Sequence, residues 1–313
     1  MGYFLFDTHA DTPYEMYKRG FTLRDNPLHI SLDKTTNLQK YCQCMAIWSD
    51  SRLTDNEAFA SFKKIYEYFK TQTEADGGGR ICTSYADITE AHTEGKAAFV
   101  MTVEDARLLG GDISRLDLLA ECGIKILTLT WQGESCIGGA FDTDARLTSF
   151  GKKVVSGCAQ RGMITDISHS NANTALEIID IASQTRSPVI ATHSNSYTVY
   201  AHDRNMSDEV FSRLVRCGGI VGISLAIQHI KGKQNVTSED VFSHIDHYAE
   251  REGIEYICLG CDYDGIERAP QDLQNISMIE NLAECMLRHN YSEDYVKHVF
   301  YENARRFMNK HLK

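Results

Sequence analysis

Eight short apolar runs, separated by segments of helical periodicity, are the feature that most constrains how this chain folds. Buried strands that alternate with helices pair in parallel through right-handed crossovers. Eight such units close most simply into an α/β fold with one sheet, a single (β/α)8 TIM-like barrel. The runs are Phe4–Phe6, Cys44–Trp48, Ala97–Thr102, Lys125–Thr130, Met163–Ile167, Pro188–Ala191, Gly219–Leu225 and Tyr256–Leu259.

Helix signals occupy most of the segments between these runs. Val154, Val155 and Cys158 recur at helical spacing, and Gly162 follows as a stop signal, which predicts a helix over Thr148–Arg161. Comparable patterns predict helices at Asn173–Ala182, Ser207–Val215, Ser238–Glu250, Asn275–His289 and Ser292–Asn309.

An open doubly wound sheet is the alternative architecture. It would usually carry a glycine-rich phosphate loop after an early strand, and no G-x-G-x-x-G occurs here. Gly77-Gly78-Gly79 is interpreted as a flexible loop. Because no internal repeat or linker is visible, we expect one domain over residues 1–313. The segment from Tyr14 to Lys40 is longer than a simple βα unit needs, and we expect it to lie over the barrel mouth.

Composition argues against several kinds of partner. A net charge of −11 without a block of Lys and Arg disfavours nucleic acid and anionic membrane surfaces. We expect neither a transmembrane helix nor a signal peptide, because no long apolar run and no basic leader are present. The cysteines bear on a separate question, the redox environment of the protein. Ten scattered cysteines in a chain without an expected signal peptide indicate reduced thiols and a cytoplasmic location. Cys42-x-Cys44 and Cys258-x-x-Cys261 are interpreted as buried structural thiols.

Metal-ligating side chains follow five of the predicted strands. His9 and Asp11 are two residues apart, so on an extended backbone their side chains share one face. The ends of parallel barrel strands meet at one rim, where enzymes of this fold keep their active sites. A mixed set of nitrogen and oxygen ligands suits zinc or similar ions, and six ligands suggest two metals. The other four candidates are Glu104, His169, His193 and Asp262.

Each candidate alone has an ordinary structural explanation. His169 is explained equally well as a core histidine, and Glu104 or Asp262 as a helix cap. The coincidence at several strand ends favours a shared site. His244 and His247 share a helix face away from the rim and are interpreted as a solvated pair. No comparable context surrounds the remaining histidines, His29, His92, His202, His229, His289, His298 and His311.

A series of short motifs spans the chain from residue 7 to about 307. They are Asp7-Thr8-His9-Ala10-Asp11, Val103-Glu104, Leu127-Thr128-Leu129-Thr130, Leu147-Thr148-Ser149-Phe150-Gly151, Asp166-Ile167-Ser168-His169, Thr192-His193-Ser194-Asn195, Arg204-Asn205, Gly260-Cys261-Asp262-Tyr263-Asp264-Gly265 and Asn303-Ala304-Arg305-Arg306-Phe307. In this order the motifs resemble the renal (membrane) dipeptidase family, which comprises zinc-dependent dipeptidases within the amidohydrolase-like metallo-dependent hydrolases.

The resemblance implies a site with two Zn²⁺ ions per chain. His9 and Asp11 would bind one zinc ion, and His169 and His193 would bind the other. Glu104 would bridge both ions, together with a hydroxide that attacks the peptide carbonyl. The chain would then be a hydrolase that cleaves dipeptides, with small dipeptides as its partners. The family also accepts a D-residue on the C-terminal side.

The resemblance also implies how a dipeptide would be held. Asp262 would accept the proton and contact the substrate's amino group, and Arg204 would bind the terminal carboxylate. Without the family, Arg204 would be taken for an exposed loop residue. Trp131 is a departure, because mammalian-type members carry a substrate-contacting histidine there. The indole N–H is the only donor of Trp131, so carbonyl polarisation would rest mainly on the metals.

Two alternative functions stay open at this point. A barrel rim with these ligands also supports metal-dependent hydrolysis of lactones, other amides or esters, because a fold does not fix a function. A metal-binding barrel without catalysis would keep the fold and lose the reaction. Related barrels are often dimers, so a homodimer is compatible with the resemblance. The mammalian enzymes' secretion, disulfide link and lipid anchor are not expected here.

Overall fold

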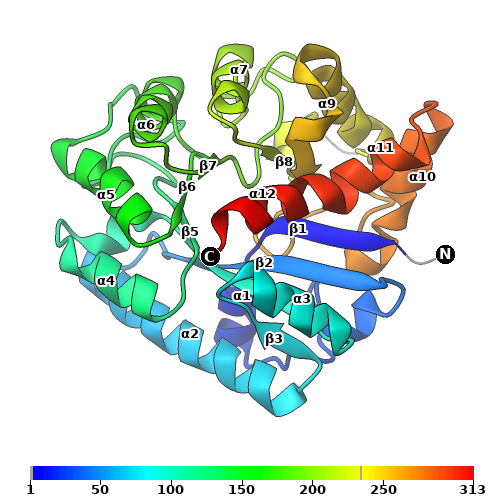
Figure 1. Cartoon of the computed structure of the whole chain (residues 1–313), viewed down its shortest axis with the longest axis horizontal. Helices are drawn as coiled ribbons and strands as arrows, with labels where there is room; N and C mark the ends of the chain where they lie inside the picture. Colours follow the sequence, from blue (N-terminus) through cyan, green and yellow to red (C-terminus); the bar gives the residue numbers. More distant parts are fainter. Residues whose placement is uncertain (1–2, 233–234) are drawn as a thin grey trace.

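The computed structural model describes residues 3–232 and 235–313, and these residues confirm the predicted barrel (Figure 1). Within them, parallel strands run in the order β7-β6-β5-β4-β2-β1-β9-β8, and a bridge between Ala191 and Val221 joins the two ends. β3 pairs with the first residues of β4, outside this order. The strands are β1 Phe4–Ala10, β2 Lys40–Trp48, β3 Gly79–Ile81, β4 Ala97–Glu104, β5 Ile126–Thr128, β6 Ile164–Asp166, β7 Val189–Ile190, β8 Val221–Ile223 and β9 Ile257–Leu259.

Helices surround the sheet, and α12 crosses one end of the barrel (Figure 1). The helices predicted between the later strands are present with similar bounds. No helix among residues 3–232 and 235–313 has the length and apolar character needed to cross a membrane. The helices are α1 Thr12–Arg19, α2 Asp55–Asp76, α3 Tyr85–Thr93, α4 Ser114–Glu121, α5 Ser149–Gln160, α6 Ala172–Thr185, α7 Asp208–Arg216, α8 Ile227–Ile230, α9 Ser238–Glu252, α10 Glu280–Arg288, α11 Glu293–Lys297 and α12 Asn303–His311.

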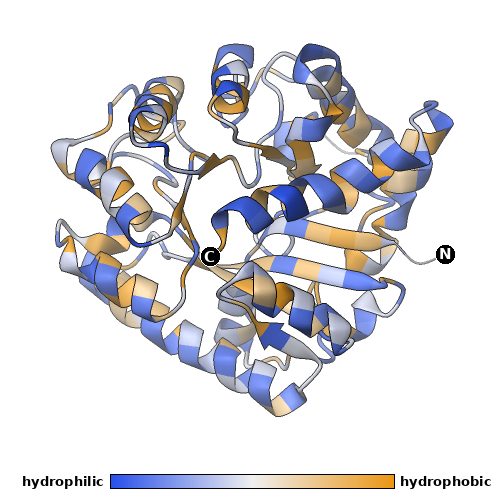
Figure 2. Cartoon of the chain, in the orientation of Figure 1, coloured by the Kyte–Doolittle hydropathy of each residue, from blue (hydrophilic) through white to orange (hydrophobic). Residues whose placement is uncertain are grey.

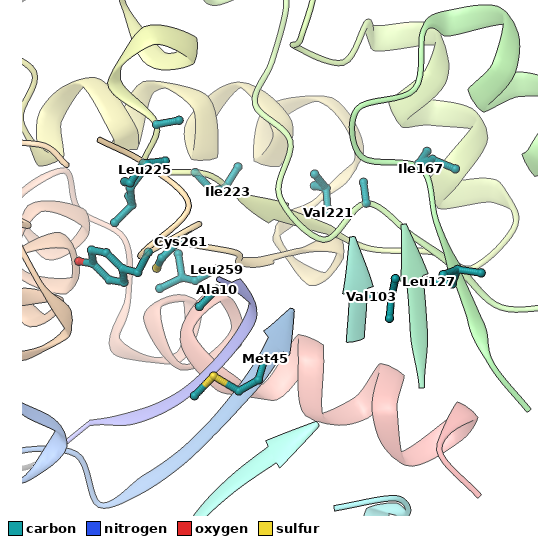
Figure 3. Packing of buried hydrophobic residues seen from close by; sticks show 14 of the residues in the cluster. Ala10, Met45, Val103, Leu127, Ile167, Val221, Ile223, Leu225, Leu259 and Cys261 are labelled. Atoms are coloured by element: carbon teal, nitrogen blue, oxygen red, sulfur yellow. The ribbon is translucent and has the colours of Figure 1, made fainter. Parts of the chain in front are cut away.

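Alternation along the strands divides the core into two clusters. On β4, Ala98 and Val100 belong to one cluster, whereas Phe99 and Met101 belong to the other. Successive strand side chains point to opposite faces, so one cluster fills the barrel and the other packs under the helices. Figure 2 shows apolar residues gathered on the strands, and Figure 3 shows the larger cluster around Val103 near the strand ends.

The cysteines are free thiols, as predicted. Cys42, Cys44 and Cys258 belong to the cluster that fills the barrel. Cys261 is buried in the larger cluster. These thiols act as small apolar side chains of the core.

Two interpretations of the sequence were wrong. Gly79 is not in a loop but begins β3, where a Cβ atom would lie 2.2 Å from Phe99 Cε2. His244 is not solvated but fully buried, and its ring contacts the N–H of Ser196 and the carbonyl of Ile230, both at 3.1 Å. These are effects of long-range packing, which local periodicity does not reveal.

A buried carboxylate, Asp166, links three neighbouring strands just below the rim. Its Oδ2 accepts hydrogen bonds from the hydroxyls of Thr128 and Thr192, both at 2.6 Å. Its Oδ1 accepts from the backbone N–H groups of Ser168 and Thr192, both at 2.9 Å. The ends of β5, β6 and β7 are therefore held in one hydrogen-bond network.

We predict that Asp166→Ala destabilises the fold strongly. The substitution leaves several buried donors without an acceptor, and each such donor costs about 1–3 kcal/mol. The free energy of unfolding, measured in urea, should fall by about 3 kcal/mol or more. Asp294→Ala is the control, because the Asp294 side chain is 76% exposed. Equal stability of the two variants would contradict the structural role of Asp166.

Candidate active site

The carboxyl ends of the strands bring the predicted ligands to one rim. His9 lies in the last part of β1, where the register with β2 shifts between Asp7 and Ala10. Asp11 follows β1 directly, and Glu104 is the last residue of β4. Parallel strands point their carboxyl ends to the same side, so the topology itself assembles this group.

Glu104 lies between histidines on two sides. Its Oε2 is 3.8 Å from His9 Nε2. Its Oε1 is 2.9 Å from His169 Nε2 and 3.3 Å from His193 Nε2. The two oxygens of one carboxylate therefore face two different groups of ligands, and this arrangement can bridge two cations.

His9 also faces the two aspartates. Its Nε2 is 3.3 Å from Asp11 Oδ2 and 3.8 Å from Asp262 Oδ1. Two overlapping sets could each hold a metal ion: His9 with Asp11 and Asp262, and His9 with Glu104 and His193. The structure thus brings all six predicted ligands together, and five of them are at least nine-tenths buried.

Hydrogen bonds orient the two later histidines so that each presents an unprotonated Nε2. His169 Nδ1 donates to the carbonyl of Trp131 at 3.1 Å. His193 Nδ1 lies 2.8 Å from the hydroxyl of Thr192, which donates its own proton to Asp166. Burial lowers the pKa of both histidines well below the usual value, so both rings are neutral.

Several buried polar atoms of these residues crowd together. The two Nε2 atoms of His169 and His193 lie 2.8 Å apart, beside Glu104 Oε1. Asp11 Oδ1 is buried and has no hydrogen-bond partner among the described residues. Buried acceptors need a compensating positive charge, so these residues fit a divalent metal.

Charges at the rim are strongly coupled. Burial, together with Asp11, raises the pKa of Glu104 well above its usual value. Burial raises the pKa of Asp262 to about 7, against the opposing effect of His9. Burial alone would lower the pKa of His9, but Glu104, Asp11 and Asp262 raise it to about 10. Acidic and basic groups with such perturbed pKa values are typical of active sites.

Backbone conformation at the rim is also unusual. His169, Asp262 and Asp264 have φ values of 67°, 62° and 69°, in the left-handed region. Residues with a Cβ rarely adopt this conformation, and it persists only where the surroundings enforce it. Here it turns side chains inward directly after strands β6 and β9.

Arg204 and Trp131 line the cavity that opens onto these ligands, a cavity of about 420 Å³. Arg204 is only 5% exposed, so it is not an exposed loop residue. Its Nη2 donates to the carbonyl of His193 at 2.9 Å, while its Nε has no partner among the described residues. Trp131 packs against Trp48, with 4.9 Å between ring centroids, and forms an aromatic wall.

Sequence reasoning missed several residues of this cavity. His229 follows β8, one of the strands for which no candidate ligand was named, and it lines the cavity with Asp264. The strand-end rule finds it only when extended to the short helix that follows the strand. His29 contacts the Asp264 backbone N–H at 2.9 Å from the segment expected over the mouth, and Tyr14 from the same segment lines the cavity.

Another group of possible ligands lies on the surface. Glu239, Cys285 and His289 come together where α9 meets α10. Glu239 and His289 are exposed and 2.6 Å apart, and Arg288 contacts the same carboxylate. An exposed carboxylate that already contacts an arginine and a histidine is an ordinary surface ion pair.

The fold and the rim define a (β/α)8 barrel with a buried centre of histidines and carboxylates. Over residues 2–312 the chain matches the family described as membrane dipeptidase, peptidase family M19, and it belongs to this family. An uncharacterized dipeptidase of Schizosaccharomyces pombe is 28% identical over 232 residues, 71% of this chain. The matched region spans only 55% of that relative's length.

Solved structures show the same fold. A metallo peptidase from Rhodobacter sphaeroides, liganded with a phosphinate mimic of the dipeptide L-Ala-D-Ala, has a TM-score of 0.92. It is 21% identical and covers 99% of this chain and 100% of its own. The dipeptidase AC, a metallo peptidase of family M19, also has a TM-score of 0.92 at 22% identity, with 99% of each chain covered.

We predict that zinc stabilises the metal-free protein through this rim. A ligand present at a hundred times its dissociation constant adds about 2.7 kcal/mol to the free energy of unfolding. The unfolding midpoint should therefore rise with zinc for the wild type and much less for Glu104→Ala. Glu239→Ala, in the surface group, is the control and should respond like the wild type. An equal response of Glu104→Ala would place the binding elsewhere.

Proposed function

We propose that this chain is a zinc-dependent dipeptidase that hydrolyses the peptide bond of dipeptides, including those with a C-terminal D-residue. Membership of the family supports the reaction. The observation that carries the proposal is the buried Glu104 carboxylate, whose oxygens face His9 on one side and His169 and His193 on the other.

Two zinc ions are proposed, one on each side of the Glu104 carboxylate. His9 and Asp11 would hold one ion, His169 and His193 would hold the other, and Glu104 would contact both. When bound, the ions would supply a shared water molecule that ionises near neutral pH and would polarise the peptide carbonyl. The hydrogen bonds at the Nδ1 atoms of His169 and His193 leave the Nε2 lone pairs free, so these atoms would be the ones to hold an ion.

Asp262 is proposed as the group that moves the proton. Its carboxyl, with a pKa raised to about 7, can accept a proton from the attacking water and return it to the leaving amine. In its ionised form it would also contact the substrate's amino group. Its place 3.8 Å from His9 puts it beside the metal ligands.

Arg204 is proposed to bind the substrate's terminal carboxylate. It lines the same cavity as Asp262, and its guanidinium retains donors that no described residue uses. Arg204 and Asp262 would then hold the two ends of the substrate, which limits its length to two residues. Trp131 would close one side of the cavity with its ring, without acting as an acid.

A C-terminal D-residue is proposed as acceptable to this site. The Rhodobacter sphaeroides metallo peptidase, which shares the fold, is liganded with a mimic of L-Ala-D-Ala. A site that holds mainly the two charged ends and the peptide bond makes few demands on the configuration of the C-terminal side chain.

The first test is a panel of L-L and L-D dipeptides, assayed with added zinc and then with a chelator. We expect cleavage of dipeptides that the chelator abolishes, and no cleavage of tripeptides or N-acetylated dipeptides. Arg204→Ala should lose activity on dipeptides, because the carboxylate contact is removed. If the zinc-loaded protein cleaves lactones or esters instead, and Arg204→Ala does so equally well, the dipeptidase proposal is wrong.

We further predict that Asp262→Asn lowers kcat for dipeptides by about a hundredfold or more, because an amide cannot accept the proton. The steady-state rates should be compared with the zinc content, measured by mass spectrometry. Glu15→Gln is a control at the wall of the same cavity. Unchanged kcat in a zinc-replete Asp262→Asn protein would exclude the proposed role.

Three expectations from the sequence stay predictions: a single domain over residues 1–313, a homodimer, and a cytoplasmic location.

A further inference from the structure

His229 occupies the active-site cavity without an assigned role. It lies on the short helix α8, after the carboxyl end of β8. Its side chain lines the same cavity as Arg204 and Asp262. Neither the strand-end ligands nor the motifs quoted above include it.

Two contacts hold His229 against the loop that carries Arg204. Its backbone carbonyl accepts a hydrogen bond from Asn205 Nδ2 at 2.7 Å. Its ring packs against that of His202, with 4.9 Å between centroids. The backbone N–H of Arg204 donates to His202 Nδ1 at 3.1 Å. The imidazole of His229 and the guanidinium of Arg204 are therefore carried by one connected unit.

The imidazole of His229 is a neutral group with a free donor. Burial, with the positive charge of Arg204, lowers its pKa to about 2. A neutral imidazole keeps one N–H donor. Among the described residues, the hydrogen bonds of His229 come from its backbone N–H and carbonyl, so the ring is available to a ligand in the cavity.

We propose that His229 binds the terminal carboxylate of the substrate together with Arg204. This inference rests on the proposed dipeptidase function and adds a second, uncharged donor to the carboxylate site. A buried anion is best satisfied by several donors, and hydrogen bonds to a charged group are stronger than neutral ones. An uncharged donor also adds no second buried positive charge beside Arg204.

The test compares a dipeptide with its C-terminal amide, which lacks the anion. We use L-Ala-D-Ala and L-Ala-D-Ala amide with His229→Phe, which keeps an aromatic ring but has no donor. KM for the acid should rise about tenfold to a hundredfold, with a smaller change in kcat. KM for the amide should stay nearly constant. His229→Gln, which retains a donor, should restore part of the affinity for the acid.

Controls separate this role from a loss of folding. His289→Phe makes the same substitution at an exposed site on the far end of α10 and should leave both substrates unaffected. Zinc content and thermal unfolding should match the wild type in each variant. An equal rise in KM for acid and amide, or no rise with the acid, would overturn the proposal.

A binding measurement distinguishes this inference from the proposed function. The affinity for a phosphinate mimic of L-Ala-D-Ala and for its C-terminal amide is measured by calorimetry. If the wild type cleaves no dipeptide but His229→Phe selectively loses affinity for the acid, the reaction is wrong and the carboxylate site stands. If dipeptides are cleaved and the two affinities fall alike, the role of His229 is wrong and the reaction stands.

Discussion

A buried carboxylate that faces nitrogen ligands on two sides is the constraint on which the rest of the site depends. Glu104 is only 3% exposed, and its oxygens lie within 2.9 to 3.8 Å of three histidines. Burying such a group costs free energy unless opposite charge or donors compensate it. Bound cations would supply that compensation, so binding of a metal and stability of the rim are expected to depend on each other.

Hydrogen bonds from the residues just beneath the rim hold the rim side chains in position. Asp166 holds Thr192, whose hydroxyl in turn orients the ring of His193. The backbone carbonyl of Trp131 does the same for His169. The side chains proposed as ligands are therefore oriented by hydrogen bonds within the chain, which is how metal sites tune ligand orientation. Trp131 thus has a backbone role that any residue could fill.

Arg204, proposed to bind the substrate's carboxylate, is positioned by the same kind of contact. Arg204 is buried and donates to the carbonyl of His193, so the proposed carboxylate-binding arginine and a proposed metal ligand share one loop. His229 joins this loop from β8 through Asn205. A shift of the loop would therefore move His193 and Arg204 together.

Local pattern was enough for the barrel, because strands buried on both faces appear as continuous apolar runs and helices buried on one face appear with a period of 3.6 residues. The order of strands and the chemistry at their ends then follow from parallel topology. The same reasoning failed for His244, whose helix spacing suggested solvent but whose ring is 0% exposed. It also set His229 aside, because this residue lies four positions beyond the predicted run Gly219–Leu225, on a short helix and not at the strand end itself.

What the sequence by itself determined is the set of parallel strands, their helices and the residue types at the rim. Only the tertiary structure decided which atoms meet: the division of the Glu104 oxygens, the tautomers of His169 and His193, and the burial of Arg204. The physical reason is the separation in sequence between the residues that interact. Apolar periodicity is a local property of each element, whereas a charge's partners come from segments far apart in the chain and are brought together by barrel closure.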